Sequence, residues 1–388
     1  MGPLAGLKIV EFAAVGPAPM CAMLLADLGA TVMRIDRVTP VELGSKRPLQ
    51  FDLLLRNREV MALDLKSAEG RAMAMEVVAD ADALIEGLRP GVMERLGLGP
   101  DDCFKRNPKL VYGRMTGWGQ KGPLAHAAAH DLNYIAVTGA LDAIGRAGQP
   151  PSIPINLLGD YAGGSLYLAL GILAALREAE RSGQGQVVDA AIMDGVSSLM
   201  TSMFGLLGAG MWKLERGTNI ADSGTPFYDV YECADGKYVS VAPIETRFFE
   251  DLLERLDIPK TDFPNRWDRT QWPRLRETLS AKFRTRTRDE WCASLEGTDA
   301  CFAPVLTMAE APKHPHAAAR EMFAEIGGVQ QPMPAPRFSR SAPELPKEPR
   351  TTTRDEALAS LRSWFGEDRY SQLQGSGRLD VVHGGGGN

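Results

Sequence analysis

The sequence is poor in cysteine and histidine, with five of each among 388 residues, and it has no excess of positive charge. None of the cysteines forms a CxxC pair, and their wide spacing is typical of a reducing compartment rather than of a disulfide framework. With 43 basic and 49 acidic residues the formal net charge is −6, which argues against a nucleic-acid-binding protein. A chain of this length can bury a sufficient core, in two or three domains, without a structural metal or disulfide.

Long apolar runs and targeting signals are also missing. The longest apolar stretch, around residues 166–176, is shorter than the roughly 20 residues that a membrane-spanning helix needs. The N-terminus lacks a basic region followed by an apolar one, and the terminal GGGGN is not a peroxisomal signal. We therefore expect a cytoplasmic protein without membrane insertion.

The first 120 residues alternate short apolar runs with helical patterns. This alternation predicts a parallel sheet covered by helices on both faces, which is an α/β fold. The first turn, at residues 13–19, lacks the GxGxxG pattern, so nothing indicates a bound NAD. The expected strands are 7–12, 31–35, 60–63, 83–85 and 110–114, and the expected helices are 18–28 and 67–79, the latter capped by Ser67.

The pattern changes after residue 225. Before it we expect helices at 131–144, 160–180 and 193–207 and a strand at 186–191, and the second helix is apolar enough to lie in a core or an oligomer interface. Two alternating runs, 228–233 and 237–241, flank Ala234-Asp235-Gly236 and predict a type I′ hairpin. Helices are expected at 247–255, 272–283 and 288–295. We predict a large domain, 1–224 with 321–388, a smaller α+β domain at 225–320, and a proline-rich extended strap at 332–350.

Three ionisable residues are candidates for catalysis. His130 opens a helix whose dipole favours the neutral imidazole, ready to take a proton, and the alternative is a capping histidine satisfied by a backbone carbonyl. Asp160 lies among small residues, where burial would raise its pKa for acid–base or nucleophilic work, and the alternative is an ordinary helix cap. Glu245 begins a helix, where a solvated carboxylate is the usual occupant.

Other polar residues were weighed as ligand sites. His314 and His316 flank a proline, but no cysteine or carboxylate stands at ligand spacing, so we expect a loop and no metal. Basic residues gather in two segments, and arginines at strand ends suit a phosphorylated ligand at the carboxyl edge of the sheet, with ordinary solvated surface as the alternative. They are Arg34, Arg37, Lys46, Arg47, Arg56 and Arg58 in the first segment and Lys105, Arg106, Lys109, Arg114 and Lys121 in the second.

Several stretches together resemble the class III CoA-transferase family of CaiB/BaiF type, and most closely its racemase branch, in order over residues 4–340. The resemblance rests on VMRIDR at 32–37, LDLKS at 63–67, LIEGLRPGVMERLGL at 84–98, YGRMTGWGQKGP at 112–123, HDLNY at 130–134 and residues 156–165. It implies an interlocked homodimer in which each chain has a Rossmann-like large domain and a small domain. It places the active site between the large domain of one subunit and the small domain of the other.

The resemblance also implies a site and a reaction. The racemase branch inverts the α-carbon of 2-methylacyl-CoA thioesters by two-base proton transfer, which maps here onto His130, oriented by Glu245, and Asp160. The backbone N–H of Asp131 corresponds to the oxyanion hole, and no metal or redox cofactor is required because CoA is part of the substrate. The positions implied to contact CoA are Arg37, Leu63, Asp64, Leu65, Lys66, Gly87, Leu88, Arg89, Arg95, Ala129, His130, Asp131, Leu132, Asn133 and Tyr134.

Two alternatives remain beside the racemase. In a CoA-transferase, Asp160 would attack the thioester and carry the acyl group, but such an enzyme has no evident use for His130 and Glu245. A non-catalytic acyl-CoA-binding protein would not need the three ionisable residues. The chain departs from the racemase pattern at Ala129, where glycine is usual, and at Ser223, Thr225, Thr246 and Arg247, which leaves the acyl group open.

Overall fold

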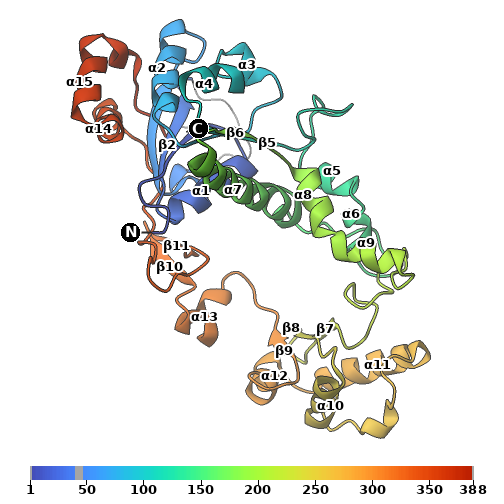
Figure 1. Cartoon of the computed structure of the whole chain (residues 1–388). Coiled ribbons are helices and arrows are strands. Elements are labelled where there is room, and N and C mark those ends of the chain that lie inside the picture. The colour runs from blue at the N-terminus through green and yellow to red at the C-terminus, as the bar shows by residue number, and fades with distance from the viewer. Residues whose placement is uncertain (1, 40–46, 387–388) are drawn as a thin grey trace. The chain divides into compact units, whose positions relative to one another are not determined.

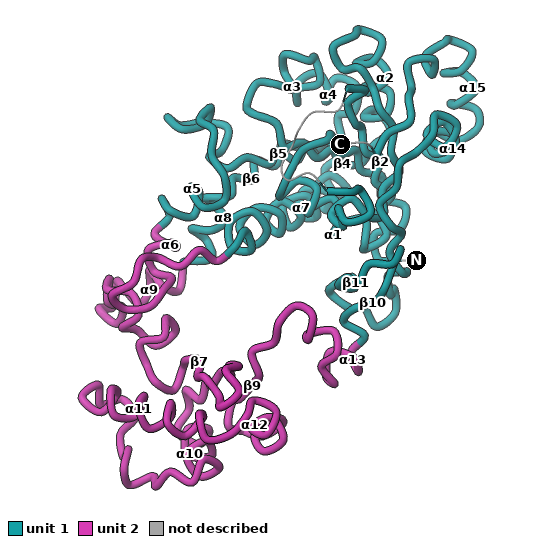
Figure 2. Tube along the Cα trace, turned by 180° about the vertical axis from the view of Figure 1, so that it is seen from behind, with its two compact units in different colours: residues 1–138, 155–200, 321–388 teal, residues 139–154, 201–320 magenta. Residues whose placement is uncertain are grey.

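Six parallel strands form the centre of the larger of two units in this computed structural model, which describes residues 2–39 and 47–386 (Figures 1 and 2). Their order in the sheet is β3-β2-β1-β4-β5-β6, so the chain runs outward from β1 to β3 and then reverses direction at β4. The predicted α/β fold with a parallel sheet is confirmed. The strands are β1 Lys8–Phe12, β2 Thr31–Arg37, β3 Arg58–Leu63, β4 Ala83–Glu86, β5 Val111–Thr116 and β6 Gln186–Ala191.

Helices cover both faces of this sheet because its central strands are apolar on both sides. On one face α1 (Pro17–Asp27) and α7 (Tyr167–Ser182) pack against the strands and each other. On the other face a continuous core joins the sheet to α2 (Ala68–Ala79), α4 (Pro100–Arg106), α14 (Arg354–Phe365) and α15 (Glu367–Gly375). The hydroxyl of Ser67 accepts the N–H of Gly70, which confirms the predicted cap of α2.

Buried ion pairs account for three of the six basic residues in the first segment, Arg34, Arg56 and Arg58. Glu11 on β1 accepts Arg34 at 2.8 Å and Arg58 at 2.9 Å, and Arg34 also reaches Asp36 at 2.7 Å. Arg56 is likewise buried against Asp27. The interpretation of these arginines as part of a ligand-binding patch is therefore wrong, since their guanidinium groups are used inside the fold. Lys46 lies outside the described residues.

The same correction holds at the other end of the sheet. Arg114 on β5 is buried and donates to Glu86 at 2.8 Å and to Glu94 at 2.7 Å. Glu94 belongs to the short helix α3 (Val92–Arg95) that follows β4. The guanidinium group of Arg114 thus joins β5 to the segment after β4 instead of facing a ligand.

Three predicted helices are interrupted in the structure. The predicted helix 131–144 is divided into α5 (Asp131–Ala136) and α6 (Ala140–Ala143) at Gly139, whose φ of 82° ends a helix. The helix expected at 160–180 begins earlier, as the π-helix η3 (Leu157–Leu166), and continues as α7. The helix expected at 193–207 consists of α8 (Ile192–Leu199) and α9 (Thr201–Gly208).

The combined helix Leu157–Ser182 is longer and more apolar than the sequence suggested. Among the residues that the structure describes, it is the one helix whose length and composition would suffice to cross a membrane, since an 18-residue window within it has a mean hydropathy of 1.3. The longest apolar stretch expected from the sequence was 166–176, which is shorter than the helix in the structure. Within the unit α7 packs along β5 and β6, and a helix that covers a sheet meets the same criterion.

The end of the chain completes the outer edge of the sheet. After the hairpin β10 (Phe323–Ile326) and β11 (Val329–Pro332), residues 333–352 run without helix or strand, consistent with the predicted strap. The last ordered turn, η7 (Arg378–Val381), leads to His383, whose backbone pairs with Ala62 of β3. Gly384, Gly385 and Gly386 fit where side chains cannot; a Cβ at Gly384, for example, would lie 2.0 Å from the carbonyl oxygen of Thr352.

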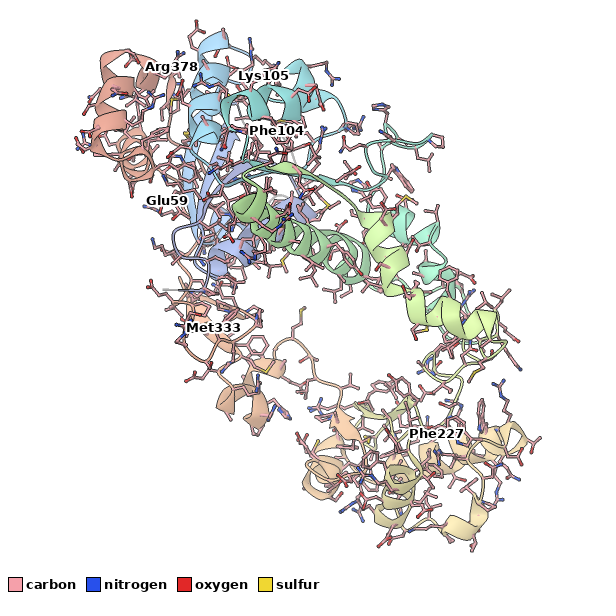
Figure 3. All side chains as sticks on the ribbon, in the orientation of Figure 1. Glu59, Phe104, Lys105, Phe227, Met333 and Arg378 are labelled. Carbon is pink, nitrogen blue, oxygen red and sulfur yellow. The ribbon has the colours of Figure 1, made fainter. Side chains whose placement is uncertain are left out.

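The smaller unit holds a three-stranded antiparallel sheet in the order β7-β8-β9, formed by Asp229–Glu232, Tyr238–Val241 and Phe302–Pro304. Its core surrounds Phe227, Phe283 and Trp291, and Phe227 is marked in Figure 3. The covering helices are α10 (Thr246–Arg255), α11 (Trp272–Phe283) and α12 (Arg288–Leu295), followed by α13 (Pro315–Ala319). Short 3₁₀ helices occur at 49–51, 53–55, 260–262, 269–271 and 311–313.

The hairpin between β7 and β8 uses a different turn from the predicted one. A type I′ turn needs two residues with positive φ, but here only Gly236 has one, at 74°. The N–H of Gly236 bonds to the carbonyl of Cys233, and the N–H of Cys233 bonds to Lys237. This is a type I turn followed by a left-handed glycine, the other common way to close a short hairpin.

The two units divide the chain differently from the predicted domains. Unit 1 comprises Met1–Thr138, Ile155–Met200 and Glu321–Asn388, and unit 2 comprises Gly139–Pro154 and Thr201–Arg320. Residues 139–154 and 201–224, assigned to the large domain from the sequence, therefore belong with the smaller unit. Ion pairs explain this: Arg146 reaches Asp229 at 2.7 Å, and Arg216 reaches Asp142 at 2.8 Å.

Candidate functional site

A cavity of about 310 Å³ opens in unit 1 beyond the carboxyl ends of β1, β4 and β5. Its walls include residues 15–17 after β1, 87–90 after β4 and 115–118 at the end of β5. Because the strand order reverses between β1 and β4, the loops after these two strands diverge and leave a crevice, where ligands commonly bind in such folds. The remaining walls come from Ala125, residues 127–130, Tyr134, Asp160 and Ile192.

His130 lies at the rim of this cavity as the residue before α5. Its backbone is extended, with φ −134° and ψ 175°, and its N–H donates to the side-chain oxygen of Asn133 at 3.1 Å. Its carbonyl accepts the N–H of Asn133 at 2.8 Å, so the chain turns into the helix immediately after the histidine. His130 is exposed, which leaves its imidazole accessible from the cavity.

Asp160 enters the same cavity from the first turn of η3 and is partly buried. Its pKa is raised from 3.8 to about 6, chiefly by burial and in addition by the negative charge of Asp131. A hydrogen bond from the side chain of Asn156 and the charge of His130 act against this shift. A carboxyl group with such a pKa can both accept and release a proton near neutral pH.

Asp131 connects the two segments that carry His130 and Asp160. Its carboxylate is buried, and Oδ1 accepts the backbone N–H of Asp160 at 2.6 Å. The resemblance implied an oxyanion role for the backbone N–H of Asp131 and a contact with CoA, so this contact of its side chain with Asp160 was not predicted. Burial raises the pKa of Asp131, while the N–H groups of Asp160 and Gly159 oppose the shift.

Aromatic side chains form one wall of the cavity. The hydroxyl of Tyr134 donates to the carbonyl of Ala129 at 2.6 Å, and the Tyr134 ring meets Trp118 edge to face with centroids 4.8 Å apart. Sequence reasoning missed Trp118, Val15 and Gly16 as cavity residues. The glycines in YGRMTGWG could have indicated them, because they predict a loop after a strand, at the carboxyl edge of the sheet where ligands bind in such folds.

The structure brings only part of the predicted CoA-binding set to this cavity. The predicted residues that line it are Gly87, Leu88, Arg89, Ala129, His130 and Tyr134, together with Asp160. Arg37 is the last residue of β2, and Asp64, Leu65 and Lys66 follow β3, at the same edge of the sheet but outside the cavity. Other predicted residues that do not line it are Arg95, Asp131, Leu132 and Asn133. Leu63 is fully buried in the core, so it offers no surface to a ligand.

Glu245 belongs to unit 2, where it is the exposed residue before α10. Its predicted role beside His130 therefore stays a prediction. Among residues 2–39 and 47–386 no group of three His, Cys, Asp or Glu side chains is arranged to hold a metal ion. His314 is instead bonded through Nε2 to Glu296 at 2.6 Å.

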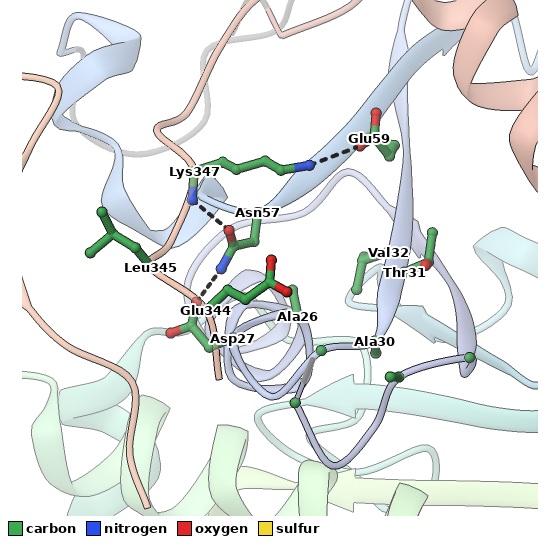
Figure 4. Close-up of a pocket in the computed structure, with 14 residues that line it drawn as sticks. Ala26, Asp27, Ala30, Thr31, Val32, Asn57, Glu59, Glu344, Leu345 and Lys347 are labelled. Carbon is green, nitrogen blue, oxygen red and sulfur yellow. Dashed lines mark hydrogen bonds and ion pairs between the residues drawn. The ribbon is translucent and has the colours of Figure 1, made fainter. Parts of the chain in front are cut away.

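A second cavity, of about 280 Å³, lies at the opposite edge of the sheet and contains none of the predicted site residues (Figure 4). Asn57 spans it, donating to Asp27 at 2.7 Å and accepting the backbone N–H of Lys347 at 2.6 Å. These bonds fasten the proline-rich strap to the start of β3, which indicates a structural role.

Comparisons with known proteins find relatives that cover most of the chain. The profile of CoA-transferase family III matches residues 4–355. An alpha-methylacyl-CoA racemase from Mus musculus is 40% identical over 372 residues, which are 96% of this chain and 95% of that protein. An acetyl-CoA:oxalate CoA-transferase from Acetobacter aceti is 31% identical over 378 residues, 94% of this chain and 96% of that protein. The crystal structure of a CAIB/BAIF family protein from Brucella suis superposes with a TM-score of 0.76 at 26% identity, covering 93% of this chain and 99% of that one.

Proposed function

The chain belongs to CoA-transferase family III, and we propose that it is an α-methylacyl-CoA racemase, which inverts the α-carbon of 2-methylacyl-CoA thioesters. The observation that carries this proposal is that His130 and Asp160 line one cavity. Inversion removes a proton from one face of the α-carbon and returns one to the other, so it needs two groups that act in turn as base and acid. The identity of 40% to a racemase, against 31% to a transferase, supports the same choice.

In the proposed mechanism one of the two residues removes the α-proton and leaves an enolate of the thioester. The negative charge develops on the thioester oxygen, where a backbone N–H at the start of α5, that of Asp131, would stabilise it. The other residue then protonates the opposite face. With a pKa of about 6, Asp160 is suited to both directions of the reaction.

Three further features belong to the proposal. The active enzyme is a homodimer, in which Glu245 orients His130, and the phosphates of CoA bind Arg37, Lys66, Arg89 and Arg95. The reaction needs no metal or redox cofactor, because the thioester itself acidifies the α-proton. The enzyme acts in the cytoplasm on acyl-CoA.

A deuterium wash-in assay tests the proposal. The protein is incubated in D₂O with one epimer of a 2-methylacyl-CoA and no second carboxylic acid, and the expected result is deuterium at the α-carbon together with epimerisation. His130→Ala and Asp160→Ala should each abolish inversion, and full activity in either variant would reject the two-base scheme.

The second candidate, a CoA-transferase, is favoured by one observation, the carboxylate of Asp160 in the cavity beside His130. Such a carboxylate could attack the thioester and form an anhydride. The assay separates the two functions: absence of exchange, with transfer of CoA to an added carboxylic acid, would establish the transferase.

A further inference from the structure

The side chain of Asp131 bonds to the backbone of η3 rather than within its own helix. Its Oδ1 accepts the N–H of Asp160 at 2.6 Å, and Gly159 also donates its N–H to this carboxylate. Asp131 follows His130 directly, and Asp160 is the other proposed proton-transfer residue. One carboxylate thus joins the two backbone segments that carry both groups, although 29 positions separate Asp131 from Asp160 in the chain.

The neighbouring glycine is shaped to this contact. A Cβ at Gly159 would lie 2.3 Å from Oδ1 and 2.8 Å from Cγ of Asp131, distances at which atoms overlap. No larger residue fits at 159 while the carboxylate keeps its place. The Gly-Asp pair at 159–160 and the His-Asp pair at 130–131 therefore depend on each other, because the carboxylate of Asp131 fits only beside a glycine at position 159.

The environment of Asp131 is unusual for a buried acid. The residue is 7% exposed, Oδ2 has no hydrogen-bond partner, and no lysine, arginine or histidine in the described parts of the chain forms an ion pair with it. Elsewhere in the unit, buried acids such as Glu11 and Asp27 are paired with arginine. A carboxylate held only by backbone N–H groups keeps its negative charge available to act on its neighbour.

We propose, on the basis of the proposed function, that Asp131 is a positioning residue: it holds Asp160 at a fixed place relative to His130, and its charge keeps Asp160 able to take and give a proton near neutral pH. The groups that face Asp160 act in opposing directions. Burial and the charge of Asp131 raise its pKa, whereas His130 and the side chain of Asn156 lower it. Of these groups, only Asp131 contributes both a backbone bond and a negative charge.

Two substitutions at position 131 separate the bond from the charge. Asp131→Asn keeps an oxygen for the N–H groups of residues 159 and 160 and removes the charge, so the pKa of Asp160 should fall and the acidic limb of the exchange rate should move to lower pH. Asp131→Ala removes the bond as well. Because small displacements of reacting groups cost on the order of 100-fold in rate, we expect a loss of about that size in kcat with little change in KM.

The decisive measurement is independent of activity. In protein labelled with ¹³C at the aspartate carboxyl carbon, the Asp160 signal, identified by its loss in Asp160→Asn, is titrated in the wild type and in Asp131→Asn. Asp189→Asn is the matched control, because Asp189 also accepts a backbone N–H and has a raised pKa, but it lies outside the cavity.

We expect the pKa of Asp160 to fall in Asp131→Asn and to stay unchanged in Asp189→Asn. An unchanged pKa in Asp131→Asn would overturn the role of the charge, and full kcat in Asp131→Ala would overturn the role of the bond. If the wild type exchanged no α-proton, the proposed function would fail, while the titration would still decide whether Asp131 acts on Asp160.

Discussion

Replacing Asp160 by asparagine should stabilise the protein at neutral and alkaline pH while abolishing its activity. The folded-state pKa of Asp160 is raised from 3.8 to about 6, chiefly by burial. Below pH 3.8 the carboxyl group is protonated in both the folded and the unfolded state and has no effect. As the pH rises towards 6, only the unfolded state loses the proton, so the wild type is progressively destabilised, and above pH 6 the loss is constant.

The size of this stabilisation follows from the difference between the pKa of Asp160 in the unfolded state, 3.8, and in the folded state, about 6. Each pH unit between the two pKa values is worth about 1.36 kcal/mol, which amounts to about 3 kcal/mol, and partial exposure to solvent reduces the expected loss to about 2 kcal/mol. Asparagine cannot ionise and avoids this loss. In a chain of this length the difference corresponds to a rise of about 2–3 °C in the unfolding temperature.

The assay is thermal unfolding of the wild type and Asp160→Asn at a series of pH values from 4 to 8. The two proteins should unfold at similar temperatures near pH 4 and diverge as the pH rises to 7, with the variant more stable. Other buried acids, such as Glu86, titrate in the same way in both proteins, so their effects cancel in the difference between the two unfolding temperatures. A difference that does not depend on pH, or a variant that is less stable at pH 8, would refute the assignment of a raised pKa to Asp160.

Two further predictions concern the core of unit 1. Gly195→Ala would place a methyl group 1.9 Å from the carbonyl oxygen of Gly163, where α8 crosses η3. Urea unfolding should therefore show that the free energy of unfolding falls by about 1–3 kcal/mol. The control is Gly205→Ala, also in a helix, where a Cβ has nothing within 4 Å and no such loss is expected. Arg56→Met would leave Asp27 buried without its cation and should cost about 3–5 kcal/mol in the same measurement, and a cost below 1 kcal/mol would contradict the role of the pair.

The regular part of the fold could be predicted from local patterns. The bounds of the edge strand β6 and of the amphipathic helix α11 follow from the pattern of a few neighbouring residues, and the cap at Ser67 is determined within one turn. The interruptions could not be predicted in this way. The sequence pattern before residue 167 is the same for an α-helix and for a π-helix, and the close packing of α8 against η3 is a contact between distant segments that local patterns do not show.

The candidate site was predictable in its residue types and not in its contacts. His130 and Asp160 stood out as ionisable groups at helix starts, and the structure places both on one cavity. The partner of Asp160 could not be predicted, because the bond from Asp131 depends on how two distant segments meet. For the same reason the sequence could not show that Arg34 and Arg58 face Glu11 rather than a ligand.

The pairing of His383 with Ala62 has a consequence for the synthesis of the chain. Strand β3 is translated before residues 201–320, which make up most of unit 2, but its outer neighbour at His383 and the apolar side chains of α14 and α15 that close the core follow them. The core of unit 1 therefore cannot close until the segment that contains most of unit 2 has been synthesised. Until then the apolar face of the sheet that these helices cover stays exposed, a state that favours aggregation.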